Sequence, residues 1–223
     1  MAVRLNKAFV LRKLFQLSGI VPLGAFLLEH FYTNSKALSG AAAYNESVVA
    51  LQGIPYVLLV EIFGIFLPLT FHAVYGLKIS LEAGPNNLNY GYARNWLYTV
   101  QRVTGAFLFL FILFHLLNFR FGLMPGLNTE AVAHHPDRAY EIVQREMQLP
   151  WVVALYVVGI TSTVWHFAHG TWLFLVDWGI VIGARAQRYV GYACFAAGAA
   201  LLAVGLNSLA AFIIPGGLTG QIF

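Results

Sequence analysis

Four of the seven histidines lie singly in long apolar segments of the chain, at His30, His72, His115 and His166. Ionisable side chains are costly in such surroundings and often mark functional sites. A neutral imidazole is also a common ligand of transition metals and of haem iron. Four imidazoles on four separate segments therefore predict ligation between facing helices.

Two of these histidines are expected near the same end of the bundle. His30 lies 17 residues beyond Lys13, which is about 25 Å along a helix that rises about 1.5 Å per residue. His115 lies five residues before Arg120. If successive segments run in opposite directions, both histidines lie near the end opposite the N-terminus, which we call the outer level.

The other two are expected closer to the N-terminal end. His72 lies six residues before Lys78, about 9 Å along the helix. His166 lies 11 residues before Asp177. Both fall in the half of the bundle that contains the N-terminus, which we call the inner level.

Depth therefore pairs His30 with His115 and His72 with His166. Two haems, each with one axial imidazole from either side, require such an arrangement. A zinc or copper site would instead gather three or four ligands at one depth. The single Cys194 excludes a C-x-x-C-H attachment, so each haem would be held non-covalently.

The remaining histidines are weaker candidates. His169, three residues after His166, is an alternative ligand for the inner level. His134 and His135 lie in a polar segment, where solvated side chains are expected.

The elements that must position these residues are membrane helices. Of the 223 residues, 59% are hydrophobic and 10% are charged, against about 25% charged in soluble domains. A helix needs about 20 apolar residues to cross the hydrocarbon layer, and peptide groups in lipid must bond within the segment. We predict an all-α integral membrane bundle in one domain, with five transmembrane helices at about 14–33, 54–82, 95–120, 149–177 and 188–214.

Basic residues predict the orientation of this bundle. Nine of the thirteen Lys and Arg residues fall on the side of the N-terminus, and such residues concentrate in cytoplasmic segments. The N-terminus is therefore expected in the cytoplasm and the C-terminus, after five crossings, outside. The net charge of +4 reflects this distribution rather than nucleic-acid binding. Because the first span lacks a small-residue cleavage site, we expect no removable signal peptide.

Two longer loops are expected outside, at 33–53 and 120–148. The segment AVAHHPDRAYEIVQRE in the second predicts a short surface helix.

The sequence around the four histidines resembles the single-chain, five-helix, di-haem cytochrome b anchors of succinate dehydrogenases and fumarate reductases. The likeness is carried by GIVPLGAFLLEH, EIFGIFLPLTFHAVYG, YARNWLYTVQRVTG, GITSTVWHFAHGTWLF and the histidine of the third span. It covers almost the whole chain. In that family the four matching histidines bind two haems b, the first with the third and the second with the fourth. Relatives often have a short polar residue at the position of His169.

The resemblance implies a subunit of a succinate:quinone oxidoreductase (complex II) in a bacterial cytoplasmic membrane, an enzyme of the tricarboxylic acid cycle. It implies two partners on the cytoplasmic face, a flavoprotein with covalent FAD and an iron–sulfur subunit. Electrons from succinate would pass through the inner haem and the outer haem to a quinone, usually menaquinone. The dicarboxylate chemistry would occur elsewhere, so no catalytic residue for it is expected in this chain.

Two carboxylates are candidates for quinone contacts. Glu61 stands 11 residues before His72, close to three helical turns, at the outer level. Its carboxyl group is a candidate for hydrogen bonding or proton relay to quinone, and the alternative is an interfacial carboxylate paired with a neighbouring polar group. Glu29 is a second, weaker candidate.

Gln16 and Arg102, the latter together with Arg94, are candidates for contacts with haem propionates at the inner level. Either arginine could equally be an orientation signal or contact a lipid headgroup.

Two other protein classes stay open at this point. Cytochrome b subunits of formate dehydrogenases, hydrogenases and quinol:cytochrome c enzymes also bind two haems, but several take two ligands from one helix. A transporter with histidines in a proton path is the second alternative. Transporters commonly have repeated halves and broken helices, and no repeat is evident in this sequence.

Overall fold

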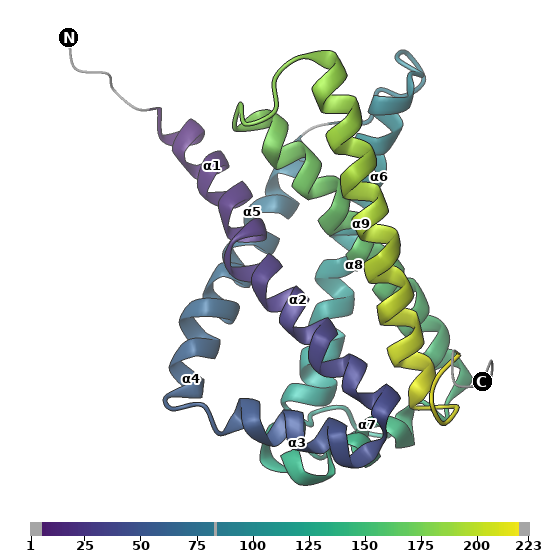
Figure 1. Cartoon of the computed structure of the whole chain (residues 1–223). Helices are drawn as coiled ribbons and strands as arrows, with labels where there is room; N and C mark the ends of the chain where they lie inside the picture. The colour runs from purple at the N-terminus through teal and green to yellow at the C-terminus, as the bar shows by residue number, and fades with distance from the viewer. Residues whose placement is uncertain (1–5, 83, 219–223) are drawn as a thin grey trace.

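The computed structural model describes residues 6–82 and 84–218 and consists of a helical bundle (Figure 1). Within this described part, five helical stretches are long and apolar enough to cross a membrane. The predicted all-α fold with five transmembrane helices is therefore confirmed. The stretches are α1 (Lys7–Ile20) with α2 (Pro22–Ser35); α4 (Val57–Val60), η2 (Glu61–Phe66) and α5 (Leu67–Glu82); α6 (Ala93–His115) with η3 (Leu116–Arg120); α8 (Pro150–Asp177); and α9 (Ala184–Ala211).

The first crossing is divided at Pro22. Proline has no backbone N–H, so the hydrogen bond that this position would donate to the preceding turn is missing. On either side the helical bonds continue: Val21 N donates to Leu17 O at 2.9 Å, and Ala25 N donates to Val21 O at 3.3 Å. The crossing thus consists of two helices, α1 and α2, with one interruption between them.

A row of glycines lets α9 pack closely against its neighbours. Gly191, Gly198 and Gly205 are buried at seven-residue intervals on one side of this helix. A Cβ atom on Gly198 would lie 2.8 Å from Cβ of Ala168 in α8, and one on Gly205 would lie 2.5 Å from Cε1 of Phe31 in α2. Small residues permit such close approach where lipid offers no hydrophobic force between helices. α9 carries no histidine, and it supports the helices that do.

Two short helices cover the end of the bundle opposite the N-terminus, α3 (Ala41–Gln52) and α7 (Ala139–Glu146) (Figure 1). The loop predicted at 33–53 is wrong for the part that forms α3. The reason is tertiary: Tyr44 and Val48 lie one helical turn apart and are both buried, and the Tyr44 ring packs edge-on against Phe212 at 5.2 Å between centroids.

The surface helix predicted in the second loop is shorter than the segment 131–146. Two 3-10 turns, η4 (Val132–His134) and η5 (Pro136–Arg138), precede α7. Pro136 is the first residue of η5, where it prevents one continuous helix because it cannot donate a backbone hydrogen bond.

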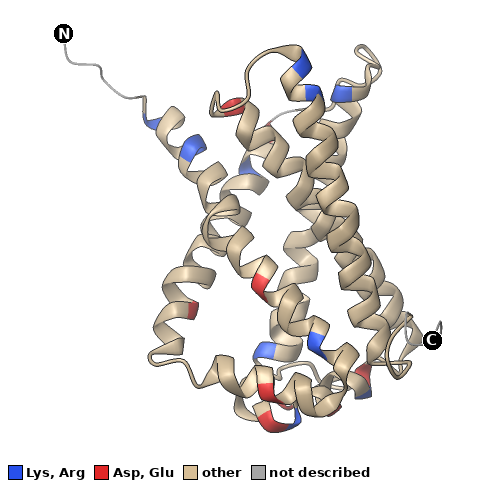
Figure 2. Cartoon of the chain, in the orientation of Figure 1, with Lys and Arg blue, Asp and Glu red and all other residues tan. Residues whose placement is uncertain are grey.

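Charged residues are distributed unequally between the two ends (Figure 2). Lys and Arg predominate at the end that holds the N-terminal residues and the α8–α9 connection, whereas both signs occur around α3 and α7. We keep the names inner end for the former and outer end for the latter, following the orientation expected from the positive-inside rule.

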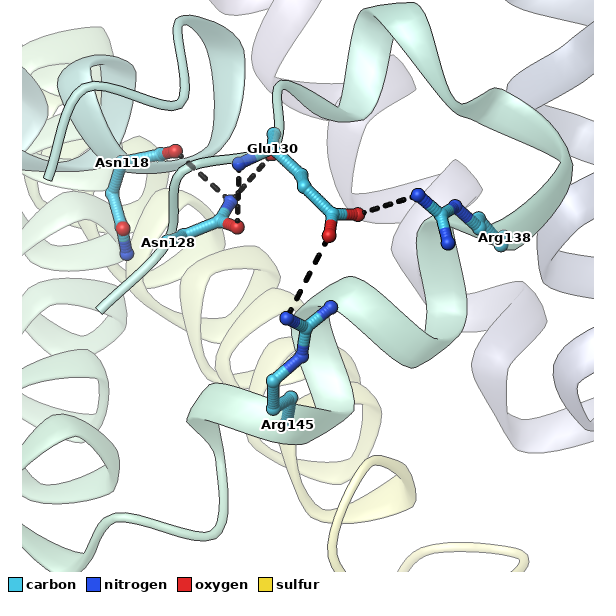
Figure 3. Close-up of polar contacts among 5 residues, drawn as sticks. All are labelled: Asn118, Asn128, Glu130, Arg138 and Arg145. Atoms are coloured by element: carbon cyan, nitrogen blue, oxygen red, sulfur yellow. Dashed lines mark hydrogen bonds and ion pairs between the residues drawn. The ribbon is translucent and has the colours of Figure 1, made fainter. Parts of the chain in front are cut away.

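The loop at the outer end is fixed by a polar network (Figure 3). Asn128 Nδ2 donates to the backbone oxygens of Asn118 (3.2 Å) and Glu130 (2.7 Å), and Asn128 Oδ1 accepts from Glu130 N (3.1 Å). The Glu130 carboxylate pairs with Arg138 at 2.8 Å and, more loosely, with Arg145 at 3.9 Å. The network attaches the loop to η3 on one side and to α7 on the other.

Candidate functional site

The outer pair of histidines lies together, as depth predicts. His30 comes from α2, and His115 is the last residue of α6. Their ring centroids are 5.8 Å apart and their planes meet at 83°.

The inner pair has the same arrangement. His72 on α5 and His166 on α8 have ring centroids 6.4 Å apart and planes at 85°. The structure thus holds four histidines from four crossings as two pairs, one in each half of the bundle.

Both separations suit an iron atom between the rings. An imidazole nitrogen binds a first-row metal ion at about 2 Å, and the ring centre lies about 1 Å behind that nitrogen. Two axial imidazoles on opposite sides of one iron therefore have centroids about 6 Å apart, close to both pairs here.

The surroundings of His72 favour a proton on one particular ring nitrogen. His72 Nδ1 lies 3.0 Å from Phe15 O and 3.3 Å from Ser18 Oγ, both on α1. A proton on Nδ1 donated to the carbonyl leaves Nε2 with a free lone pair. Gly19 makes room for this ring, because a Cβ there would lie 2.5 Å from His72 Cε1.

His166 has a similar pair of neighbours on α6. Its Nδ1 lies 3.3 Å from Thr104 Oγ1, and a Cβ on Gly105 would lie 3.0 Å from its Cε1. Its backbone oxygen accepts a hydrogen bond of 3.0 Å from Gln101 Nε2. A small residue thus lies against each inner imidazole, on the helix that also contacts Nδ1.

The outer histidines have different partners. His115 Nδ1 lies 2.9 Å from the hydroxyl of Tyr156, which is buried on α8. His30 Nε2 lies 3.4 Å from Asn34 Nδ2 one turn along α2. Three of the four imidazoles therefore have Nδ1 beside an oxygen, the kind of contact that orients a ligating histidine and raises its basicity.

His169 is packed among residues other than the inner pair. It is 1% exposed, it stacks on Trp165 with 5.8 Å between ring centroids, and it lies 6.1 Å from Phe195 of α9. Its Nδ1 is 2.9 Å from Gln101 Oε1. Since Gln101 also binds the His166 backbone, His169 joins α8 to α6 and α9.

Replacing His169 by alanine should therefore destabilise the fold without changing the haem content. The truncation leaves a cavity and deprives Gln101 of a buried partner, so we expect a loss of about 2–4 kcal/mol in unfolding free energy. Thermal unfolding in detergent would measure the loss, and the haem absorption spectrum would check the ligands. Loss of haem from a folded His169→Ala protein would contradict this assignment.

Glu61 is paired with Arg120. The two Arg120–Glu61 contacts are 2.6 Å (Nη2 to Oε2) and 3.2 Å (Nε to Oε1), and the Glu61 side chain is 12% exposed. The pair brings together two π-helical segments, η2 beginning at Glu61 and η3 ending at Arg120. The predicted alignment of Glu61 with His72 counted α-helical turns only, whereas the π-helical segment η2, which has more residues per turn, lies between them. The alignment stays a prediction.

The remaining polar candidates join helices at the inner end or lie within α2. Gln16 Oε1 accepts a 3.0 Å bond from Trp178 Nε1 just after α8. Arg102 donates to the backbone oxygen of Ser80 and thereby connects α6 with α5. Glu29 accepts a 2.5 Å bond from Thr33. Propionate and quinone contacts of these residues stay predictions.

Comparison with known proteins shows the family of the chain. A sequence profile described as the succinate dehydrogenase/fumarate reductase transmembrane subunit matches residues 84–205. The succinate dehydrogenase cytochrome b558 subunit of Bacillus subtilis (strain 168) is 36% identical over 208 residues, which are 93% of this chain and 98% of that protein. The chain belongs to this family of transmembrane subunits.

Membership of the succinate dehydrogenase/fumarate reductase family confirms the resemblance and decides against the formate dehydrogenase, hydrogenase and transporter alternatives. With five apolar crossings and a bacterial relative, the chain is a multi-pass protein of the bacterial cytoplasmic membrane and part of an oxidoreductase.

Several residues of the site had no signal in the sequence. Gly19 and Gly105 are two of 21 glycines, and their contacts with the imidazoles depend on how α1 and α6 cross α5 and α8. Tyr156 lies ten residues before His166 on the same helix, but its hydroxyl contacts Nδ1 of His115 on another helix. Such contacts between helices emerge only from the packing.

Proposed function

We propose that this chain is the membrane-embedded, di-haem cytochrome b subunit that carries electrons from an iron–sulfur subunit to quinone. The observation that supports this most is the pair of edge-to-face imidazole couples, 5.8 and 6.4 Å between centroids, in opposite halves of the bundle. His30 and His115 would bind the outer haem b, and His72 and His166 the inner one. A bound haem supplies one-electron transfer through its iron.

The chain's own contribution is to hold and tune the ligands. Phe15 O, Thr104 Oγ1 and Tyr156 OH lie next to Nδ1 of His72, His166 and His115 respectively. These contacts fix each ring's orientation and increase the electron density on Nε2. Gln16 and Arg102, at the inner end, are our candidates for propionate contacts.

Quinone, which we expect to be menaquinone, would react at the outer end beside the Glu61–Arg120 pair. A carboxylate held by two hydrogen bonds from a guanidinium has a fixed geometry, and Arg120 lies five residues after His115. We infer that Glu61 accepts or delivers a quinone proton at this level.

The partners would be a flavoprotein with covalent FAD and an iron–sulfur subunit, docked at the inner end on the cytoplasmic face. The accumulation of Lys and Arg at that end is compatible with such docking (Figure 2). Succinate oxidation would take place in the flavoprotein, so this chain would be needed for quinone reduction and not for the dicarboxylate step.

Haem quantification tests the proposal directly. The complex is purified from membranes with its accompanying subunits, and its haem b is measured as the pyridine haemochrome against the amount of this chain. Two haems b per chain are expected. A complex that contains this chain and only one haem, or none, would refute the di-haem proposal.

A further inference from the structure

Glu146, the last residue of α7, is a buried carboxyl group that the proposed electron path does not use. The residue is 2% exposed. Its Oε2 accepts a 2.5 Å bond from Asn118 Nδ2, and its Oε1 is buried with no partner among the described residues. Because an ionised carboxylate is costly to bury without full hydrogen bonding, this environment increases the affinity of the carboxylate for a proton.

Polar side chains connect Glu146 to the outer histidine pair. Asn118 is 0% exposed and lies three residues after His115, on η3. The Tyr156 hydroxyl, 2.9 Å from His115 Nδ1, also interacts with the Asn118 side chain and with the charge of Glu146. Glu146, Asn118, Tyr156 and His115 are therefore successive neighbours between the end of α7 and an expected haem ligand.

The neighbouring cation is directed elsewhere. Arg145 extends toward Glu130, which also binds Arg138 (Figure 3). Burial is the largest effect on the pKa of Glu146 and raises it, while the Asn118 hydrogen bond and the Arg145 charge partly oppose this rise. Further titratable or charged groups lie on the elements packed around it: Tyr44 and Glu46 on α3, Asp137 and Arg138 on η5, Tyr140 and Glu141 on α7, His115 on α6, Arg120 on η3 and Tyr156 on α8.

We propose that Glu146 is a proton-binding residue whose protonation is coupled to the redox state of the outer haem. The proposal rests on the di-haem function above. One electron arriving from the inner level adds one negative charge at the outer site. In response the Glu146 carboxylate takes up one proton from the outer aqueous phase, and it releases that proton when the electron passes on to quinone. Glu146 acts through Asn118, Tyr156 and His115, and so is a positioning residue rather than a catalytic one.

The sign of the effect follows from the charges. The reduced site disfavours an ionised Glu146 more than the oxidised site does, so reduction becomes harder as the pH rises and the proton becomes scarcer. With one proton fully coupled to one electron, the equilibrium constant changes tenfold per pH unit, which is about 59 mV. The midpoint potential of the outer haem should therefore fall with rising pH, by at most this slope.

The test is a redox titration of both haems in the purified complex at a series of pH values. Glu146→Gln retains an oxygen that accepts from Asn118 but cannot ionise. We expect its outer midpoint to lose most of the pH slope and to remain at the high value that the wild type reaches at low pH. Glu141→Gln, an exposed site on the same helix, is the matched control and should keep the wild-type slope.

Three outcomes overturn the proposal: a wild-type outer midpoint that does not vary with pH, an unchanged slope in Glu146→Gln, or the same loss of slope in Glu141→Gln. If Glu146→Gln fails to assemble, Glu146→Asp is used. Its carboxyl sits one methylene further from Asn118, so the sloping pH range should shift, and an unshifted range also overturns the proposal. Haem content is measured first: absence of an outer haem in the wild type refutes the di-haem function and with it the role of Glu146, whereas a missing or unchanged pH slope with both haems present refutes only the role of Glu146.

Discussion

Replacing His72 by alanine is expected to remove the inner haem and leave the outer one, so that the haem b content falls from two to one per chain. Alanine supplies no axial nitrogen, and His166 alone would have to hold the iron. The outer pair is built from other helices, α2 and α6. Pyridine haemochrome quantification measures the content, and redox titration identifies which haem remains.

The complementary variant is His115→Ala, which should remove the outer haem and keep the inner one. His134→Ala is the control, since His134 is exposed in the loop before α7 and should leave both haems in place. Retention of two haems in His72→Ala would show that the inner pair is not the ligand set. The amounts of the three variant proteins in the membrane are also compared. A variant that loses haem because the whole protein is unstable is recognised by its lower amount.

Replacing Glu61 by glutamine is expected to lower quinone-dependent electron transfer by about 100-fold, the lower end of what a positioned acid or base contributes. Glutamine keeps the size and one acceptor oxygen but cannot exchange a proton. Reduction of both haems by succinate should remain fast, because these steps precede quinone. Quinone reduction and haem reduction are therefore measured on the same preparation.

Loss of the salt bridge with Arg120 is a second, structural explanation for slower quinone reduction in Glu61→Gln. The experiment must distinguish it from the loss of proton exchange. The double variant Glu61→Gln with Arg120→Gln removes the unbalanced cation. If Glu61 exchanges protons with quinone, the double variant stays slow, whereas recovery of activity would mean that Glu61 serves only to neutralise Arg120. Glu82→Gln is the matched control, as Glu82 lies at the inner end of the same crossing and is exposed.

The pairing of the histidines could be predicted because the rise of an α-helix is nearly constant. His72 lies six residues before Lys78 and His115 five before Arg120. These spacings give the depth of each histidine, whichever way its helix is rotated about its axis. Hydrophobic length likewise identifies all five crossings. The direction in which a side chain points is harder to predict, because it depends on the number of residues per turn, and a π-helical segment lies between Glu61 and His72.

The network of Glu146 could not be predicted for a different reason. In the sequence it is one of several charges in a polar loop segment, where solvent exposure is the ordinary expectation. It becomes buried because α7 places its apolar face, including Ile142 and Val143, against the bundle core. Asn118 and Tyr156 then meet it from two other elements.

The interruption at Pro22 has a mechanical consequence. Phe15, Ser18 and Gly19, which lie next to His72, belong to α1 before the interruption. His30 lies on α2 after it. The first crossing therefore consists of two helices that meet at Pro22, and each contacts a different histidine pair. If a partner protein docks at the inner end and displaces α1, the interruption would take up the movement, and the proposed outer haem site would keep its geometry.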